Sequence, residues 1–334
     1  MSAHPGPAPS PTPDAQLLVT AFTVIAHRGA SGYLPEHTLA GAAMAHAMCV
    51  DFIELDTVLT RDGELVVLHD LVLDAMTNVA ERFSGRQRAD GRHYAADFTL
   101  TEIQSLRVGE RQGQDGKPEF PGRFPAGLRP FRIPTLRDEI SLIQGLNRAT
   151  GRNVGIYIEP KAPAWHRDEG KDLFPVVLAQ LAEFGLTAAQ SPVILQSFDH
   201  DELRRARYEL GSELRLVQLI GENEWQESPT DFDHMRSEAG LREIAGFAQG
   251  IGPWLPQVVE IKEDGRIDIS DLTARAHHLD LFVHGYTLRS DQLPPQAPDF
   301  SAVVELLIRG VKLDGVFADQ PDLVIEAVSN LATD

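Results

Sequence analysis

From residue 23 onward the chain alternates between short apolar segments typical of β-strands and amphipathic segments typical of helices. The strand-like segments lie near 23–27, 52–59, 154–160, 193–197, 214–220, 249–253, 280–285 and 314–318. The helix-like segments follow them at 38–50, 136–149, 171–185, 200–211, 234–248, 270–278, 301–309 and 321–331. This succession predicts an α/β fold, with a (β/α)8 TIM barrel as the first choice and an open, doubly wound sheet as the alternative.

Residues of the kinds that form sites close several of these strands, which favours the barrel. They are His27, Glu159, Gln196, His284 and Phe317. In a TIM barrel the active site lies at the carboxyl ends of the strands. We therefore expect the functional site at that end of the barrel.

The first fifth of the chain concentrates side chains that bind cations and move protons. Glu54 and Asp56 stand two apart in the apolar segment FIELDTVL, so both point to one face of a strand. Carboxylates in such a segment are costly unless they are paired or bind a metal, and paired oxygens suit a hard divalent cation. His27 and Arg28 end the preceding strand, and His69 ends the strand that returns after a hairpin turn.

One long interval breaks the alternation. Between Asp70 and about residue 136 no regular helix is expected, and the segment is rich in Gly, Pro, Arg and Phe. An interruption of this length usually carries function or is disordered.

The amino terminus differs in composition from the rest of the chain. Residues 1–16 carry proline at positions 5, 7, 9, 11 and 13, and such a segment is extended and cannot build a core. We therefore expect a flexible Pro-rich tail over 1–20 and one domain over 21–334. The tail lacks the features of a signal peptide. The protein is expected to be cytoplasmic if the chain is complete, and periplasmic or secreted if a leader has been removed.

Charge restricts the partners. A formal net charge of −19 argues against nucleic acid or an anionic membrane as a general partner, and no run is long enough for stable membrane insertion. An anionic ligand needs a locally positive site, which Arg28, Lys161 and a bound cation would supply. The single cysteine, Cys49, excludes an intrachain disulfide, and its place in an apolar helical run predicts a small buried side chain. We expect a monomer or a homodimer.

Several motifs resemble those of one known family. They are HRGASGYLPEHT at 27–38, the ELD strand with its terminal HD, IPTL at 133–136, IQGLNRATGRNVGIYIEPKAP at 143–163, LQSFDHDEL at 195–203 and GVFADQPD at 315–322. In this order they resemble the glycerophosphodiester phosphodiesterases, in particular the bacterial periplasmic-type branch. The resemblance runs from about residue 23 to about 325.

The resemblance implies a TIM barrel with a small subdomain, at about 74–132, that caps the active site. It also implies metal-dependent hydrolysis of glycerophosphodiesters, such as glycerophosphocholine, glycerophosphoethanolamine and glycerophosphoglycerol, to sn-glycerol 3-phosphate and an alcohol. Such cleavage requires neutralised charge on the phosphoryl oxygens, a base and an acid. His27 and His69 are the predicted acid and base, and the sequence leaves their assignment open.

The predicted metal ligands are Glu54, Asp56 and Glu159, with Lys161 on the same face as Glu159. Three carboxylates without a cysteine or histidine set favour Ca²⁺ or Mg²⁺ over zinc. The resemblance favours Ca²⁺, with Mg²⁺ as the alternative. The predicted contacts to substrate or phosphate are Arg28, Glu36, Lys161, Gln196 and Phe317.

The remaining candidates have weaker support. Trp254, His284 and Tyr286 are expected either to line the mouth of the site or to pack in the core. Asp319 is predicted to be a turn or cap residue, and His166 is expected to be structural.

Two other functions are compatible with the same residues. Within the same chemistry, the substrate is a glycerol-phosphate wall polymer or a lysophospholipid, which an apolar or open groove in the insertion would favour. In a different class, the chain is a non-catalytic metal-binding barrel, an alternative that fails if both histidines face the metal.

Overall fold

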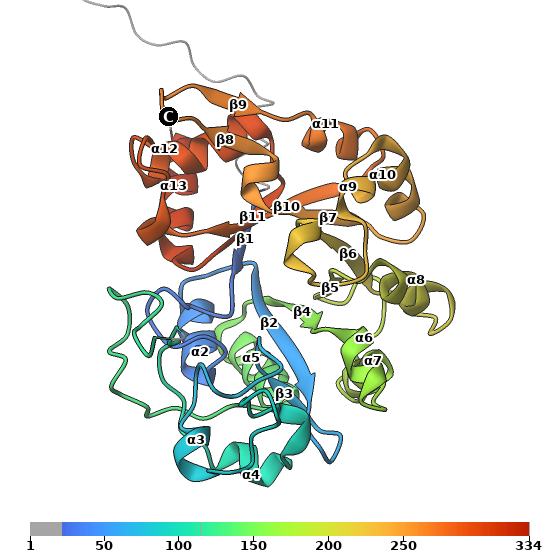
Figure 1. Ribbon diagram of the computed structural model, residues 1–334. Coiled ribbons are helices and arrows are strands. Elements are labelled where there is room, and N and C mark those ends of the chain that lie inside the picture. The colour runs from blue at the N-terminus through green and yellow to red at the C-terminus, as the bar shows by residue number, and fades with distance from the viewer. Residues whose placement is uncertain (1–21, 114, 334) are drawn as a thin grey trace, which may run out of the picture.

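Eight parallel strands close into a barrel within residues 22–113 and 115–333, the part of the chain that the computed structural model describes (Figure 1). In chain order they are β1 (Thr23–Ala26), β2 (Phe52–Leu59), β4 (Gly155–Pro160), β5 (Val193–Ser197), β6 (Arg215–Ile220), β7 (Gly250–Pro253), β10 (Phe282–Leu288) and β11 (Gly315–Ala318). β1 pairs with both β2 and β11, which closes the sheet. The predicted TIM barrel is therefore confirmed, and the open, doubly wound alternative is wrong.

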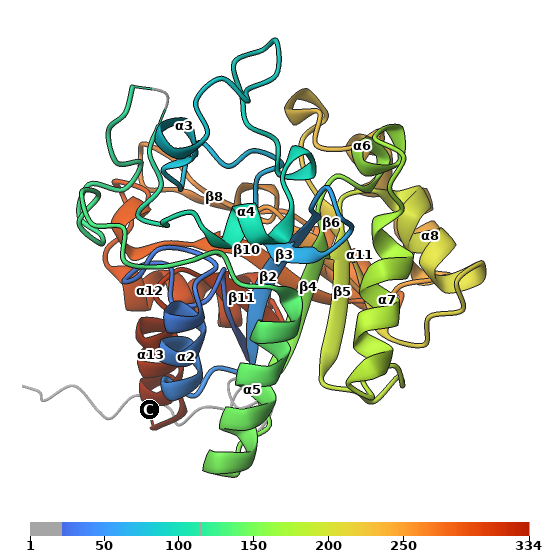
Figure 2. The ribbon, with the colours of Figure 1, turned by 90° about the horizontal axis from the view of Figure 1, so that it is seen from below.

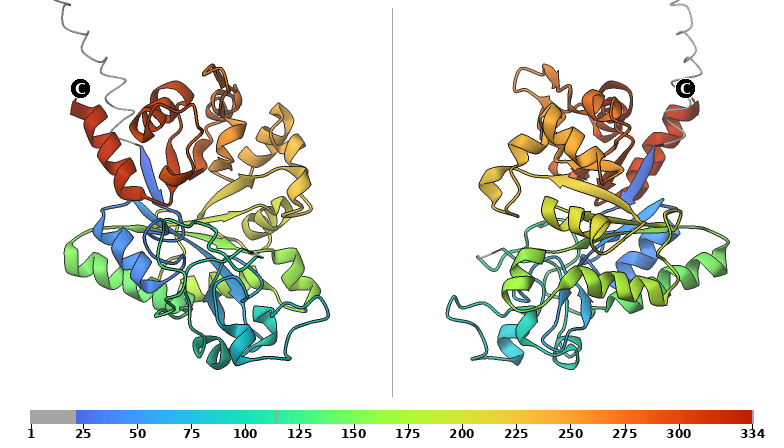
Figure 3. Two further views of the ribbon diagram at one scale, coloured as in Figure 1. Left: turned by 60° about the vertical axis from the view of Figure 1, so that its left-hand side comes forward. Right: turned by 90° about the vertical axis from the view of Figure 1, so that its right-hand side faces the viewer.

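Helices surround the barrel and connect its strands (Figure 3). They are α2 (Leu39–Ala47), α5 (Leu136–Thr150), α7 (Leu173–Glu183), α8 (His200–Tyr208), α10 (Glu238–Ala245), α11 (Leu272–His277), α12 (Phe300–Glu305), which continues as a π-helical turn over Leu306–Val311, and α13 (Pro321–Thr333). The start of α5 shows how the sequence sets a boundary: Thr135 accepts from the Asp138 backbone N–H, and the Asp138 carboxylate accepts from that of Thr135.

Alternation along the strands divides the core into two layers. Ile25, Tyr157, Ile194, Val217 and Phe317 point inward and form a cluster in the barrel interior. Their neighbours along the strands belong instead to the large core cluster that includes the helices. Because successive strand side chains face opposite sides, one short apolar strand supplies both layers.

The segment between β3 and α5 packs at one end of the barrel (Figure 2). β3 (Leu65–Val67) runs antiparallel to β2, and the segment after it contains α3 (Val79–Arg82), a 3₁₀ turn (Ala95–Asp97) and α4 (Leu100–Gln104). Its buried apolar side chains, among them Phe98 and Ile103, form a separate core with Val58 of β2 and Val66 of β3. The segment between β3 and α5 therefore has a core of its own, to which β2 and β3 also contribute.

Several short elements were not predicted, because they are too short to show periodicity. They are α6 (Pro163–Asp168), α9 (Phe232–Met235), a hairpin of β8 (Val259–Ile261) and β9 (Ile267–Ile269), and 3₁₀ turns at Asn223–Trp225, Leu255–Gln257 and Ser290–Gln292. The prediction for Cys49 is wrong. Helix α2 ends at Ala47, and Cys49 follows in a left-handed conformation (φ 69°) with its side chain exposed.

The predicted tail over residues 1–20 lies outside the described residues. Across the residues that are described, the helices lack the combination of length and apolar character that crossing a bilayer requires.

The buried His166 generates a prediction about stability. It lies on α6, both ring nitrogens lack hydrogen-bond partners among the described residues, and burial lowers its pKa to about 4. Below pH 6.5, the ordinary pKa, His166 of the unfolded chain binds a proton that it does not bind in the folded chain. The free energy of unfolding therefore decreases as the pH falls from 6.5 towards 4. Relative to wild type, the free energy of unfolding of His166→Leu should rise by up to about 2 kcal/mol as the pH is lowered from 7 to 5. Urea unfolding at both pH values measures this free energy. An equal change with pH in the two proteins would contradict the prediction.

Candidate active site

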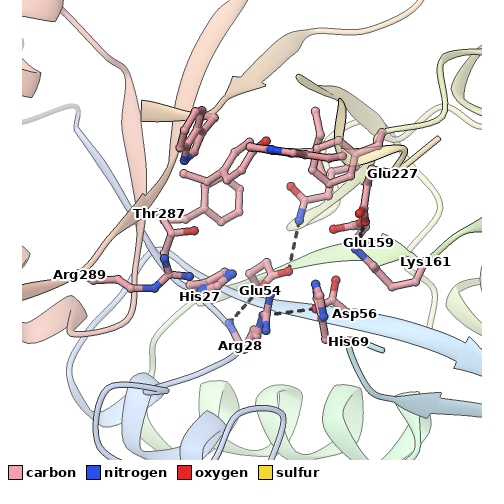
Figure 4. Close-up of a pocket in the computed structure, with 17 residues that line it drawn as sticks. His27, Arg28, Glu54, Asp56, His69, Glu159, Lys161, Glu227, Thr287 and Arg289 are labelled. Atoms are coloured by element: carbon pink, nitrogen blue, oxygen red, sulfur yellow. Dashed lines mark hydrogen bonds and ion pairs between the residues drawn. The ribbon is translucent and has the colours of Figure 1, made fainter. Parts of the chain in front are cut away.

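The pairing of β2 with β4 brings three carboxylates together. Glu54 and Asp56 lie on β2, and Glu159 of β4 stands opposite Asp56 in the parallel register. One oxygen from each lies within 4.8 Å of the others, and all three residues are buried. They line a cavity of about 260 Å³ (Figure 4).

The electrostatics of this triad fit a cation. Burial, together with the charge of Asp56, raises the pKa of Glu54 well above its ordinary value, and burial raises the pKa of Glu159 to about 8. Burial also opposes ionisation of Asp56, but a hydrogen bond from His37 and the charge of Lys161 hold its pKa well below the usual range. Asp56 Oδ1 is buried without a hydrogen-bond partner among the described residues. A hard divalent cation satisfies such an oxygen and removes the repulsion.

The neighbouring ends of β1 and β11 place His27 beside Asp319. Ile25 pairs with Phe317 and Ala26 with Ala318, and the His27 backbone N–H donates to the Ala318 carbonyl at 3.0 Å. His27 Nδ1 lies 2.6 Å from Asp319 Oδ1. Asp319, predicted as a turn or cap residue, is instead buried against the histidine.

His69 forms a second pair of the same kind. The Leu68 backbone N–H donates to the Asp56 carbonyl at 3.1 Å, which sets His69 beside the carboxylate triad. His69 Nδ1 lies 2.6 Å from Oδ1 of Asp70. Both predicted histidines therefore line the cavity that the three carboxylates line.

The two aspartates determine which ring nitrogen is available. Burial opposes their ionisation, but hydrogen bonds from the histidines hold the pKa values of Asp319 and Asp70 below their usual range. An ionised carboxylate only accepts hydrogen bonds, so Nδ1 carries the proton in His27 and in His69. Burial and the charge of Arg28 lower the pKa of each histidine to about 4. Both rings are therefore neutral near pH 7, and Nε2 is their proton acceptor.

Arg28 links the strand end to the carboxylates. Its backbone is left-handed (φ 57°), and its backbone N–H donates to Glu54 Oε2 at 2.7 Å. Its Nη1 donates to Glu36 Oε2 at 3.0 Å. A left-handed conformation costs a non-glycine residue about 1–2 kcal/mol, and these contacts offset it. His37, which the sequence did not single out, contacts Asp56 Oδ2 through Nε2 at 2.8 Å.

Lys161 and Gln196 complete the polar wall of the cavity. Lys161 Nζ lies 2.8 Å from Glu159 Oε1 and donates to Glu227 Oε1 at 2.9 Å. Gln196 Nε2 donates to Glu54 Oε1 at 3.3 Å. Figure 4 shows Lys161 and Glu227 on one side of the cavity, with His27 on the other. Glu227 was not predicted, because it lies in a loop without a motif.

Aromatic side chains form much of the remaining wall. They are Phe198, Trp225, Trp254, Tyr286 and Phe317. Of the two alternatives expected for Trp254 and Tyr286, lining the site and packing in the core, the structure shows the first. His284 lies elsewhere in the barrel interior, with its ring nitrogen 3.4 Å from the Tyr157 hydroxyl.

A second cavity, of about 130 Å³, adjoins the first and shares four lining residues with it: His27, Arg28, His69 and Arg289. Glu36 lines this second cavity and not the first. The insertion contributes Glu110, Arg111, Glu119, Phe120 and Arg123. Glu110 is buried with Oε2 unpaired among the described residues, and burial raises its pKa to about 7.

The chain matches a family model over residues 27–323, that of the glycerophosphoryl diester phosphodiesterase family. It is 41% identical over 328 residues to a glycerophosphodiester phosphodiesterase of Haemophilus influenzae, covering 92% of this chain and 90% of that protein. A protein of the same name from Treponema pallidum is 33% identical, with 91% and 90% coverage.

Solved structures show the same fold. A crystal structure of a putative glycerophosphoryl diester phosphodiesterase from Silicibacter pomeroyi superposes with a TM-score of 0.72, at 25% identity and over 93% of this chain and 94% of that one. A phosphodiesterase from Oleispira antarctica, solved in complex with the product sn-glycerol-3-phosphate, has a TM-score of 0.61, 22% identity and coverage of 92% and 96%. The family match spans most of the chain, and the chain therefore belongs to the glycerophosphoryl diester phosphodiesterase family, a family of phosphodiesterase hydrolases.

Proposed function

We propose that the protein hydrolyses glycerophosphodiesters, such as glycerophosphocholine, glycerophosphoethanolamine and glycerophosphoglycerol, to sn-glycerol 3-phosphate and an alcohol. One observation carries the proposal: a buried carboxylate triad lies in the same cavity as two histidines whose Nδ1 atoms are each held by an aspartate. The names of the similar proteins from Haemophilus influenzae and Treponema pallidum support the substrate class.

Glu54, Asp56 and Glu159 are the proposed ligands of a divalent cation, with Ca²⁺ favoured over Mg²⁺. When bound, the cation supplies Lewis-acid stabilisation of the phosphoryl oxygens. Arg28 and Lys161 add positive charge at the same cavity. A phosphodiester anion requires this charge because the chain as a whole carries −19.

The histidines are the proposed proton carriers. The nucleophile is either the glycerol hydroxyl next to the phosphate ester or water, and one neutral ring accepts its proton through Nε2 as its oxygen bonds to phosphorus. The other donates from Nε2 to the leaving oxygen, after the anionic substrate has raised its pKa. The paired aspartates stabilise each imidazolium as it forms.

The two adjoining cavities suit the two arms of a diester. The first is lined by aromatic rings and Glu227, which suit an alcohol that carries a cationic ammonium group. The second is small and lined mostly by charged groups, which suit a polyol. Because the insertion lines this second cavity with charged side chains, it favours a short polar substrate over an acyl chain. We propose that residues 74–132 cap the site on this side.

Removal of the cation tests the metal proposal. Chelation should abolish turnover and lower the Tm, and Ca²⁺ should restore both, because ligand binding stabilises the folded state by about 2.7 kcal/mol at a hundred times Kd. In Glu54→Gln the Ca²⁺-dependent Tm shift should be lost. Glu227→Gln changes a carboxylate of the same cavity outside the triad and should keep the shift. Full activity and an unchanged Tm after exhaustive chelation would refute the metal site.

Replacement of the histidines tests the proton carriers. His27→Ala and His69→Ala should each lose ~10²–10⁴-fold in kcat while the Ca²⁺-dependent Tm shift remains. His200→Ala, a change at a partly exposed histidine outside both cavities, should keep wild-type kcat. Wild-type kcat in either cavity variant would remove that histidine from the mechanism.

Replacement of Trp254 tests the aromatic wall. Trp254→Leu should raise KM for glycerophosphocholine relative to glycerophosphoglycerol by roughly 2- to 30-fold, the range that a cation–π contact allows. Trp165 stacks on Tyr94 and does not line this cavity, so Trp165→Leu is the matched control. An equal change in KM for both substrates would show that the ring does not recognise the ammonium group.

A further inference from the structure

Arg111 and Arg123 of the insertion contact the aspartates that bind the two histidines. Arg111 Nη1 donates to Asp70 Oδ2 at 2.7 Å, and the other oxygen of Asp70 binds His69 Nδ1 at 2.6 Å. Asp70 thus bridges a histidine and an arginine, with one oxygen to each. Asp319 is placed in the same way.

In the second chain of contacts Arg123 takes the place of Arg111. Its Nη2 donates to Asp319 Oδ2 at 2.7 Å, while Asp319 Oδ1 binds His27 Nδ1 at 2.6 Å. Asp319 and His27 belong to the barrel, at the ends of β11 and β1. The insertion therefore reaches each histidine through one carboxylate, Asp70 for His69 and Asp319 for His27.

Both guanidinium groups are fixed on their other sides. Arg111 also donates to both oxygens of Glu36, at 2.6 and 3.2 Å. Arg123 donates to both oxygens of Asp291, at 2.8 and 3.0 Å, and its guanidinium carbon lies 3.6 Å from the centre of the Phe120 ring. The exposed fractions of the two arginine side chains are 12% and 4%. A planar guanidinium held in this way presents its remaining N–H groups in a fixed direction.

We propose that Arg111 and Arg123 are positioning residues for His69 and His27. Each arginine fixes the carboxylate that holds Nδ1–H, and this sets the direction in which Nε2 enters the cavity. The inference rests on the proposed role of the histidines in proton transfer. It gives the insertion a function in the reaction beyond covering the site, because docking of the insertion completes the support of both rings.

The two arginine–aspartate–histidine series differ in how many arginines contact the aspartate, and this difference makes the proposal specific. Asp319 Oδ2 also accepts from Arg289 Nε at 2.8 Å, so it keeps one arginine when Arg123 is removed. Asp70 has Arg111 as its arginine partner among the described residues. Loss of Arg111 should therefore disturb its histidine more than loss of Arg123 disturbs the other.

The test uses the full chain with Ca²⁺ and glycerophosphocholine. Arg111→Ala should lower kcat by about 10- to 100-fold, the usual effect of removing a group that orients a ligand or catalytic side chain, and KM should change little. Arg123→Ala should lower kcat less. Arg111→Lys and Arg123→Lys keep the charge without the planar fork, and should show smaller losses in the same order. Arg107→Ala, at an exposed arginine of the same insertion, should match wild type.

Proton NMR gives a readout that does not depend on turnover. The short Nδ1–H···carboxylate bonds should give downfield imidazole N–H resonances, which His27→Ala and His69→Ala assign. Arg111→Ala should remove or shift the His69 resonance and leave that of His27 in place. Arg123→Ala should shift the His27 resonance and spare that of His69.

Three outcomes would overturn the positioning role. Unchanged kcat and unchanged resonances in folded Arg111 and Arg123 variants would leave the arginines as structural contacts only. A raised KM with unchanged kcat would make Arg111 a substrate-binding residue of the second cavity. Shifted resonances with unchanged kcat would show that ring position does not limit the reaction. Wild-type kcat in His27→Ala and His69→Ala would instead refute the proposed function, and the resonances would still report which arginine holds which ring.

Discussion

The site depends on one electrostatic constraint: three buried carboxylates lie within 4.8 Å of one another. Charges removed from water and crowded together are costly, so the surrounding residues must compensate them. Arg28 contributes its backbone N–H to Glu54, His37 contributes a ring nitrogen to Asp56, and Lys161 pairs with Glu159. One oxygen of Asp56 still has no partner in the described structure, and it is open to the cation proposed above.

Residues whose chemistry conflicts with their local pattern could be predicted from the sequence. Glu54 and Asp56 were conspicuous because charges are rare in an apolar strand, and Glu159 because it ends another such strand. The barrel itself followed from alternation, since each short strand is apolar on both faces and is followed by an amphipathic helix.

Residues defined by pairing between distant segments could not be predicted. Asp319 resembles a turn residue in GVFADQPD, and only the register of β1 with β11 reveals it as the partner of His27. Glu227 and Arg123 lie in segments without periodicity, where sequence alone does not specify what a charged side chain contacts. Cys49 was misplaced by two residues beyond a helix end, and helix ends are the least certain feature of a periodic pattern.

The arrangement of Lys161 suggests how an acidic protein admits an anion. Its ammonium lies between Glu159, a member of the triad, and Glu227 at the side of the cavity. The proposed cation would share the Glu159 carboxylate with Lys161, and the charge of Lys161 would then be less fully offset by its partner. Arg28 is affected in the same way, because its N–H and its side chain lie against Glu54 and Asp56. In the proposed mechanism, the positive charge that meets a phosphodiester would therefore come from the cation and from the side chains whose carboxylates it engages. Lys161 and Arg28, although paired with carboxylates in the described structure, therefore still suit the proposed phosphate site.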